Sequence, residues 1–141
     1  MKLLRTLIAP LLAVTFVAGC GDSTPEEVAE ALAGTWNATS VVFTNKANSS
    51  ETFDPLAGGG SVNTTFTAAG RFSGSFTELG GTFVVQGTNL IFTNTGESDP
   101  DTAAFTLSGN TLTLTVDDVD FDFDDDGVDE SASVTIVLQK T

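Results

Sequence analysis

The chain lacks most of the side chains that enzymes and metal centres use. Its 141 residues include no histidine and no tyrosine, one cysteine (Cys20) and one tryptophan (Trp36). Without histidine, Ser-His-Asp sites, Cys-His sites and the usual zinc ligand sets are excluded. One cysteine also excludes a disulfide within the chain. No glycine-rich loop between a strand and a helix offers a phosphate site. We therefore expect a non-enzymatic protein without an organic cofactor.

Basic residues are also scarce. The chain has five Lys and Arg residues against nineteen Asp and Glu residues, which gives a net charge of −14. No basic patch is available to neutralise phosphates, so nucleic acid is not an expected partner. An anionic membrane surface would repel such a domain.

No apolar run is long enough to span a membrane, which takes ~20 residues. The most apolar stretch, residues 7–18, follows Lys2 and Arg5 and leads into Val17-Ala18-Gly19-Cys20. A short basic segment, an apolar segment and small residues before a cleavage point are typical of a signal peptide. With the cysteine in this position, the segment resembles a bacterial lipobox.

The lipobox resemblance implies that residues 1–19 are a lipoprotein signal peptide. Cys20 would then be the first mature residue, with a diacylglycerol on its sulfur and an acyl chain such as palmitate on its amine. More than one chain suffices for stable anchoring. Gly21, rather than Asp, follows the cysteine, which implies the outer membrane in a Gram-negative cell envelope. The alternatives are an ordinary secretory signal with a cysteine nearby by chance, or an uncleaved anchor.

The mature chain would comprise a lipidated tether, residues 20–24, and one domain, residues 25–141. Residues 25–33 are predicted to form a short helix, because Thr24 can act as N-cap, Pro25 suits the first helical position and Glu27 completes a capping box. From Thr35 onward the apolar period changes to two. Eight strands are predicted, at residues 35–44, 61–68, 71–77, 82–87, 89–94, 103–108, 111–123 and 131–139.

Alternation along these strands predicts one dry face and one wet face. The expected core residues are Trp36, Val42, Val62, Phe66, Phe72, Phe76, Phe83, Val85, Leu90, Phe92, Phe105, Leu107, Leu112, Leu114, Val116, Val134, Ile136 and Leu138. Eight antiparallel strands of this kind favour an all-β fold, an up-and-down barrel in which closure removes the exposed edges. The loop at 45–61 is long and rich in glycine and serine, and its Phe53 and Leu56 could fold over one end of the sheet.

Three features together resemble bacterial lipocalin-like domains of the calycin type. A short helix runs into Gly34-Thr35-Trp36; residues 66–76 read FTAAGRFSGSF; and residues 83–93 (FVVQGTNLIFT) echo residues 105–115 (FTLSGNTLTLT). The resemblance implies that Trp36 closes one barrel end beneath a basic residue of the last strand, for which Lys140 is the candidate. It also implies a cavity for a small apolar ligand. The alternative is a barrel filled by its own side chains.

The other informative stretch is the acidic hairpin at residues 111–139. A one-residue bulge near Asp117-Asp118 would keep Val119, Phe121 and Phe123 on the inner side. Residues 122–127 read DFDDDG, which resembles the opening of a calcium loop, although position twelve would be Ser133 instead of glutamate. The candidate calcium ligands are Asp122, Asp124, Asp126, Asp129 and Glu130. The alternative is a solvated acidic tip.

Two functional hypotheses follow. The first is a membrane-anchored, monomeric lipocalin-like lipoprotein that binds a small apolar molecule or an envelope partner, with its mouth lined by the 45–61 loop. The second is a structural or interaction lipoprotein with a filled core, whose acidic hairpin binds Ca²⁺ or a basic partner.

Overall fold

The computed structural model describes residues 23–75 and 77–141. The predicted signal peptide and lipobox, residues 1–20, lie outside the described residues, as does Phe76. The elements are α1 (Pro25–Leu32), β1 (Gly34–Asn45), β2 (Thr52–Phe53), β3 (Asn63–Thr67), β4 (Arg71–Gly74), β5 (Thr77–Gln86), β6 (Asn89–Asn94), β7 (Asp101–Ser108), β8 (Thr111–Phe121) and β9 (Glu130–Lys140). In the described part of the chain, no helix has both the length and the apolar character needed to cross a membrane.

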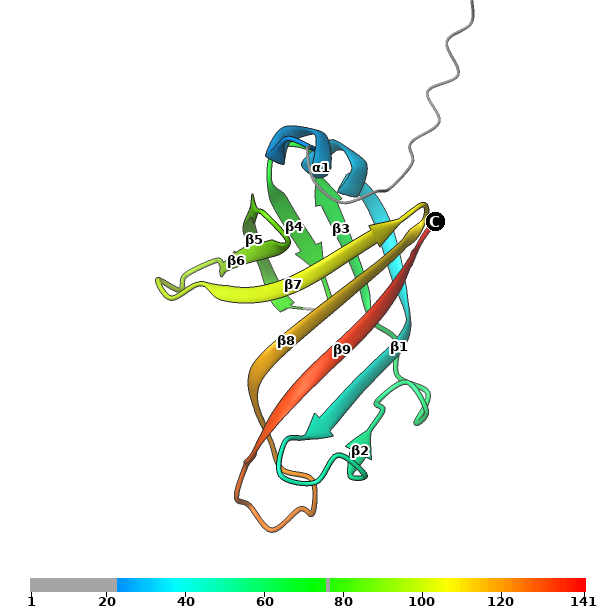
Figure 1. The fold of residues 1–141 in the computed structure, drawn as a ribbon, viewed down its shortest axis with the longest axis vertical. Helices are drawn as coiled ribbons and strands as arrows, with labels where there is room; N and C mark the ends of the chain where they lie inside the picture. Colours follow the sequence, from blue (N-terminus) through cyan, green and yellow to red (C-terminus); the bar gives the residue numbers. More distant parts are fainter. Residues whose placement is uncertain (1–22, 76) are drawn as a thin grey trace, which may run out of the picture.

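Eight of these strands form a closed antiparallel barrel (Figure 1). Each strand from β3 to β9 pairs with the next, and β1 closes the barrel because it pairs with β3 on one side and with β9 on the other. The predicted all-β fold is confirmed. The two-residue strand β2, which was not predicted, pairs with the far end of β1.

Each of the two echoing segments turns at a glycine. Gly87 and Gly109 have φ angles of 60° and 57°, a region that glycine enters without a Cβ penalty. Each belongs to a two-residue connection, since Gln86 pairs with Asn89 and Ser108 pairs with Thr111. The two echoing segments therefore form two hairpins, β5–β6 and β7–β8.

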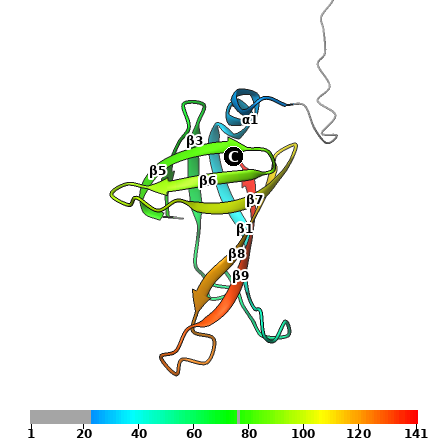
Figure 2. The same cartoon turned by 60° about the vertical axis from the view of Figure 1, so that its left-hand side comes forward.

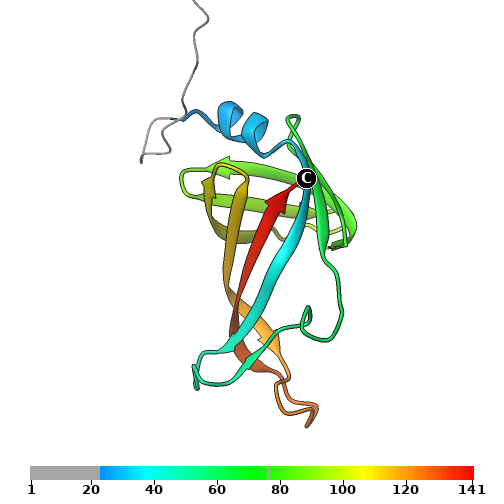
Figure 3. The ribbon, with the colours of Figure 1, turned by 90° about the vertical axis from the view of Figure 1, so that its right-hand side faces the viewer.

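Helix α1 lies across one end of the barrel, close to the C-terminus (Figure 3). It begins with the predicted capping box: Glu27 N–H donates to Thr24 Oγ1, and Thr24 N–H donates to Glu27 Oε2. These bonds satisfy two backbone donors at the helix start. The helix ends at Leu32, one residue earlier than predicted, and buries Ala29 and Leu32 against the barrel.

Most of the predicted core residues that the structure describes are buried, and the clearest difference lies in β1. The buried strand residue there is Val41, whereas Val42 was predicted. The cause is a bulge, because the pairing with β9 shifts by one residue between Ala38 and Ser40. A one-residue shift moves every following side chain to the other face. Phe43, absent from the predicted core, therefore packs against it.

The remaining differences are small. The expected core residues Val62, Phe105, Leu107 and Val116 are half-buried and pack against the core. Thr77 was predicted to end the strand at 71–77, but it begins strand β5, which also includes residues 78–81 that were predicted to lie between strands. The bulge near Asp117-Asp118 is confirmed by the register shift between Val116 and Val119 in the β8–β9 ladder.

Candidate functional site

The barrel end beneath α1 is sealed by Trp36. Its side chain is 0% exposed, and its Nε1–H donates to the Leu32 carbonyl at 2.7 Å. Lys140, near the end of β9, places its Nζ 5.4 Å from the centre of the indole ring, within cation–π range. The same Nζ donates to the Ala31 carbonyl at 3.0 Å, so it also satisfies an unpaired carbonyl in the last turn of α1. This is the arrangement that the resemblance implied for Trp36 and Lys140. We call it the closed end.

Phenylalanines fill the barrel next to the closed end. Phe66 and Phe83 meet edge to face with ring centres 5.3 Å apart, and Phe72 meets Phe92 in the same way at 5.2 Å. All four side chains are buried. Edge-to-face contacts are a favourable arrangement of aromatic pairs. This half of the barrel is filled by its own side chains.

The other half is hollow. A cavity of about 390 Å³ opens at the end opposite α1, which we call the open end. Its apolar lining comes from Val41, Phe43, Pro55, Val62, Phe92, Val116, Val119, Val134 and Ile136. Its polar lining comes from Ser75, Asn94, Asp101 and Asp118. The volume lies at the lower end of the ~300–1,000 Å³ range of small-molecule sites. The sequence left open whether the barrel is hollow or filled by its own side chains. The structure shows a filled half and a hollow half. Trp36 does not line the cavity.

The long wall of the barrel extends past the cavity and carries a row of aromatic rings. Figure 2 shows β8, β9 and β1 continuing well beyond β5 and β6. Phe121 of β8 stacks on Phe43 of β1 at 4.7 Å and on Phe53 of β2 at 5.0 Å. Phe43 pairs with Val134 of β9 and Phe121 pairs with Glu130, and the fully buried Ala132 lies between these two β9 positions. Phe53 remains 46% exposed.

The barrel wall opens between β7 and β8 toward the same end. Their ladder runs from Ser108–Thr111 to Ala104–Thr115 and stops there. Beyond that point residues 101–103 pair only with β6 and residues from Val116 onward pair only with β9, and Figure 1 shows the two strands diverging. A second hollow of about 390 Å³ lies at this split, lined mainly by polar residues that include Asp101, Asp117 and Asp118.

The sequence reasoning did not identify Asp101. It sits on the inward side of β7, because it pairs with the buried Phe92 and paired residues share a face. The sequence did contain a signal for this residue. The alternation that turns Leu107 and Phe105 inward continues through Ala103 to Asp101.

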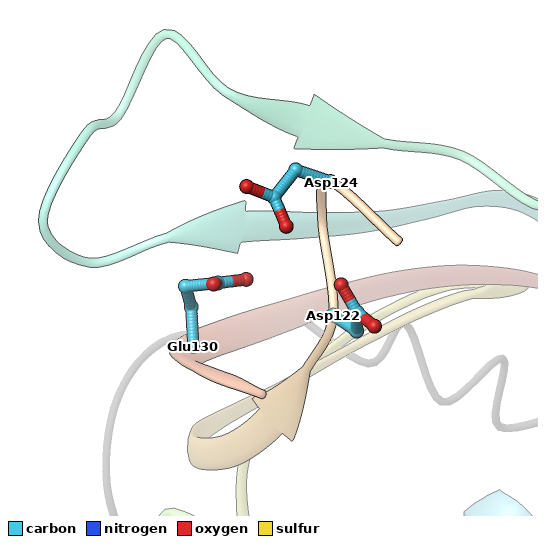
Figure 4. A group of neighbouring side chains, drawn as sticks. All are labelled: Asp122, Asp124 and Glu130. Atoms are coloured by element: carbon cyan, nitrogen blue, oxygen red, sulfur yellow. The ribbon is translucent and has the colours of Figure 1, made fainter. Parts of the chain in front are cut away.

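Three of the five predicted calcium ligands come together beyond β8. Carboxylate oxygens of Asp122, Asp124 and Glu130 lie within 4.8 Å of one another (Figure 4). Glu130 also accepts a hydrogen bond from Phe123 N–H at 2.9 Å. Clustered hard oxygen donors of this kind suit Ca²⁺.

Asp126 and Asp129 are not part of this cluster in the described residues. The Asp126 carboxylate instead accepts from Val128 N–H at 2.8 Å. Asp122 accepts from the N–H groups of Asp126 and Gly127, at 3.2 and 2.8 Å, so its carboxylate holds the loop in shape without a metal. The tight turn includes Asp125 at a φ of 57°.

Comparison with known proteins identifies the family of the domain. No curated protein and no solved structure matches the chain significantly. A family model described as a lipocalin-like domain matches residues 32–137, which include Trp36 and all eight barrel strands in whole or in part. With its sealed end, its open cavity and this match, the chain belongs to the lipocalin-like domain family.

Proposed function

We propose that this protein is a membrane-anchored, non-catalytic lipocalin-like lipoprotein that binds a small apolar molecule at the open end of its barrel. The observation that supports the proposal is the cavity of about 390 Å³, whose lining is mostly Val, Ile and Phe side chains. Burial of apolar surface yields ~25 cal/mol per Å², so such a lining favours an apolar occupant. Polar residues also line the cavity, and such groups can orient a ligand.

The anchor completes the proposal. Lipidated Cys20 would hold a monomeric barrel at the cell envelope, on the outer membrane in a Gram-negative cell. Only four residues would separate Cys20 from the helix that begins at Pro25. Because α1 lies at the closed end, this short tether would turn the closed end toward the lipid and leave the cavity open to the aqueous phase. Mass spectrometry of native protein tests the anchor: a diacylglyceryl cysteine is expected at the N-terminus, and an unmodified one would contradict it.

A cavity-filling substitution tests ligand binding. Val119 lines the cavity and is half-buried, so Val119→Trp should occupy the space of a ligand and abolish binding of a neutral probe such as 1-octanol, measured by calorimetry. The matched control is Val84→Trp, because Val84 is 62% exposed and lines no part of the cavity. Unchanged octanol binding in Val119→Trp, or no binding by the native protein, would contradict the proposal. Intrinsic fluorescence is a poor readout, because Trp36 lies at the closed end.

A second candidate function is calcium binding by the acidic loop, favoured by the convergence of Asp122, Asp124 and Glu130 within 4.8 Å. A site with a Kd of ~10⁻³ M, ordinary for extracellular modules, would raise the melting temperature by roughly 3–6 °C in ~10 mM Ca²⁺. Mg²⁺ should have a smaller effect, because it demands tighter octahedral geometry.

Neighbouring residues provide a matched pair for the calcium test. Asp124→Asn removes a carboxylate of the cluster, whereas Asp125→Asn removes one beside it, at a positive φ that asparagine tolerates. The calcium-dependent rise in melting temperature should shrink in Asp124→Asn and persist in Asp125→Asn. If the two variants respond alike, the acids act only as a diffuse negative charge.

A further inference from the structure

The charges at the cavity are gathered on one side, where β7 and β8 separate. The apolar cavity and the polar hollow at the split share three lining residues, Asp101, Val116 and Asp118. They are therefore two parts of one site, with an apolar part inside the barrel and a polar part in its wall. A ligand that fills both must have an apolar body and a polar head.

The polar part carries negative charge that the protein does not neutralise. In residues 23–75 and 77–141, the structure gives the side chains of Asp101 and Asp117 no hydrogen bond and no ion pair. Asp101 lies on the inward side of β7, so its carboxylate faces the space where a head group would sit. Both residues are exposed but line the same hollow, and two unpartnered carboxylates on one wall of a hollow favour a positive ligand group.

Within residues 23–75 and 77–141, each of the three basic residues lies elsewhere or is already paired. Lys46 is committed to Asp118, with Nζ 2.6 Å from the carboxylate oxygen. Lys140 lies over Trp36 at the closed end, and Arg71 begins β4 at the β3–β4 turn on the same side of the barrel. Phe43, which lines the cavity, adds an aromatic face, and aromatic faces attract ammonium groups.

We propose that the ligand is a cationic amphiphile, an alkyl or aryl amine. Its apolar body would fill the cavity and its ammonium head would sit in the split between β7 and β8, against Asp101. This inference rests on the proposed ligand binding and names the class of ligand. It disfavours fatty acids, because a carboxylate head would lie beside Asp101 and Asp117 without a counter-ion.

The test compares three ligands that share one apolar chain: octylamine, 1-octanol and octanoate. Each is titrated into the full-length protein by calorimetry at ~0.15 M salt, where charges more than ~8 Å away are largely screened. Octylamine should bind about tenfold more tightly than 1-octanol, since a hydrogen bond between charged groups is worth about that much. Octanoate should bind more weakly than both.

A matched pair of variants locates the head group. Asp101→Asn should weaken octylamine binding about five- to tenfold and leave 1-octanol within about twofold. Asp99→Asn removes the same charge two residues away, at an exposed position that lines neither hollow, and should change neither affinity. Circular dichroism of both variants checks that the barrel is intact.

The outcomes separate the two proposals. If the three ligands bind equally, the amine preference is wrong and apolar binding stands. If none binds, both proposals are wrong. If Asp99→Asn weakens octylamine as much as Asp101→Asn does, the preference comes from net charge and not from the split, and the placement of the head group is overturned.

Discussion

The two ends of this barrel are built from opposite kinds of contact. At the closed end, Trp36 and Leu32 are both 0% exposed, and the indole and the Lys140 ammonium donate hydrogen bonds to neighbouring carbonyls of α1. At the open end, Phe43, Val116 and Val119 are only half-buried around a cavity. The closed end is covered by the protein's own side chains, whereas the open end leaves apolar surface that a ligand could cover.

This difference shows how a small barrel can separate stability from binding. Tight packing that excludes water contributes most of the free energy of folding. A cavity forgoes part of that contribution, because its lining lacks contacts on one side. Substitutions at the closed end should therefore change the free energy of unfolding most, and substitutions at the open end should change ligand affinity most.

The largest effect is expected from Trp36→Ala. Loss of a fully buried tryptophan leaves a void and should lower the free energy of unfolding by about 4 kcal/mol. Phe43→Ala at the open end should cost about half as much, because Phe43 is only half-buried, but should weaken 1-octanol binding. Urea unfolding measures the free energy of unfolding of both variants. Circular dichroism is the readout, because Trp36→Ala removes the only tryptophan and with it the tryptophan fluorescence. Equal destabilisation by the two substitutions would contradict the conclusion that the closed end contributes more to stability than the open end.

A smaller effect is expected where α1 begins. Thr24→Ala removes an N-cap and should lower the free energy of unfolding by about 1 kcal/mol, because Thr24 Oγ1 accepts from Glu27 N–H at the start of the helix that covers the closed end. The control is Asn48→Ala, since Asn48 Oδ1 makes a similar local bond to Ser50 N–H in the loop at the open end. Its cost should be about 0.3 kcal/mol, as is usual for exposed sites. If Asn48→Ala lowered the melting temperature more than Thr24→Ala, the closed end would not be the more sensitive of the two.

The closed end could be predicted from the sequence because its signals are local. Thr24, Pro25 and Glu27 specify a helix start within four residues, and the helix leads directly into Gly34 and Trp36. The strand alternation was likewise readable, since the period of two is a property of each strand alone.

The open end could be predicted only in part, because it depends on pairing between distant segments. In the stretch that contains Val41 and Val42, both candidates are apolar, so the alternation alone could not reveal the bulge that turns Val41 inward. The split between β7 and β8 arises because the end of β7 stays paired with β6, whereas the end of β8 stays paired with β9. No pattern within either strand shows where the two separate.

The smallest effect concerns Lys46 and Lys140, the two lysines of the described residues, one at each end of the barrel. Lys140→Met removes a cation–π contact and a hydrogen bond to the Ala31 carbonyl, and should lower the free energy of unfolding by about 0.5–1 kcal/mol. It should also shift the emission of Trp36, which lies beneath the ammonium. Lys46→Met breaks the surface pair with Asp118, and such pairs contribute about 0–0.5 kcal/mol.

High salt should affect the two lysine substitutions differently. At ~1 M NaCl screening acts over ~3 Å, so the small effect of Lys46→Met should vanish. The effect of Lys140→Met should persist, because methionine keeps the apolar stem but loses two short-range contacts, the hydrogen bond to the Ala31 carbonyl and the contact with the Trp36 ring. If high salt erased both effects, the lysine at the closed end would act as a surface charge like its counterpart, and the two ends would not differ in the way their contacts indicate.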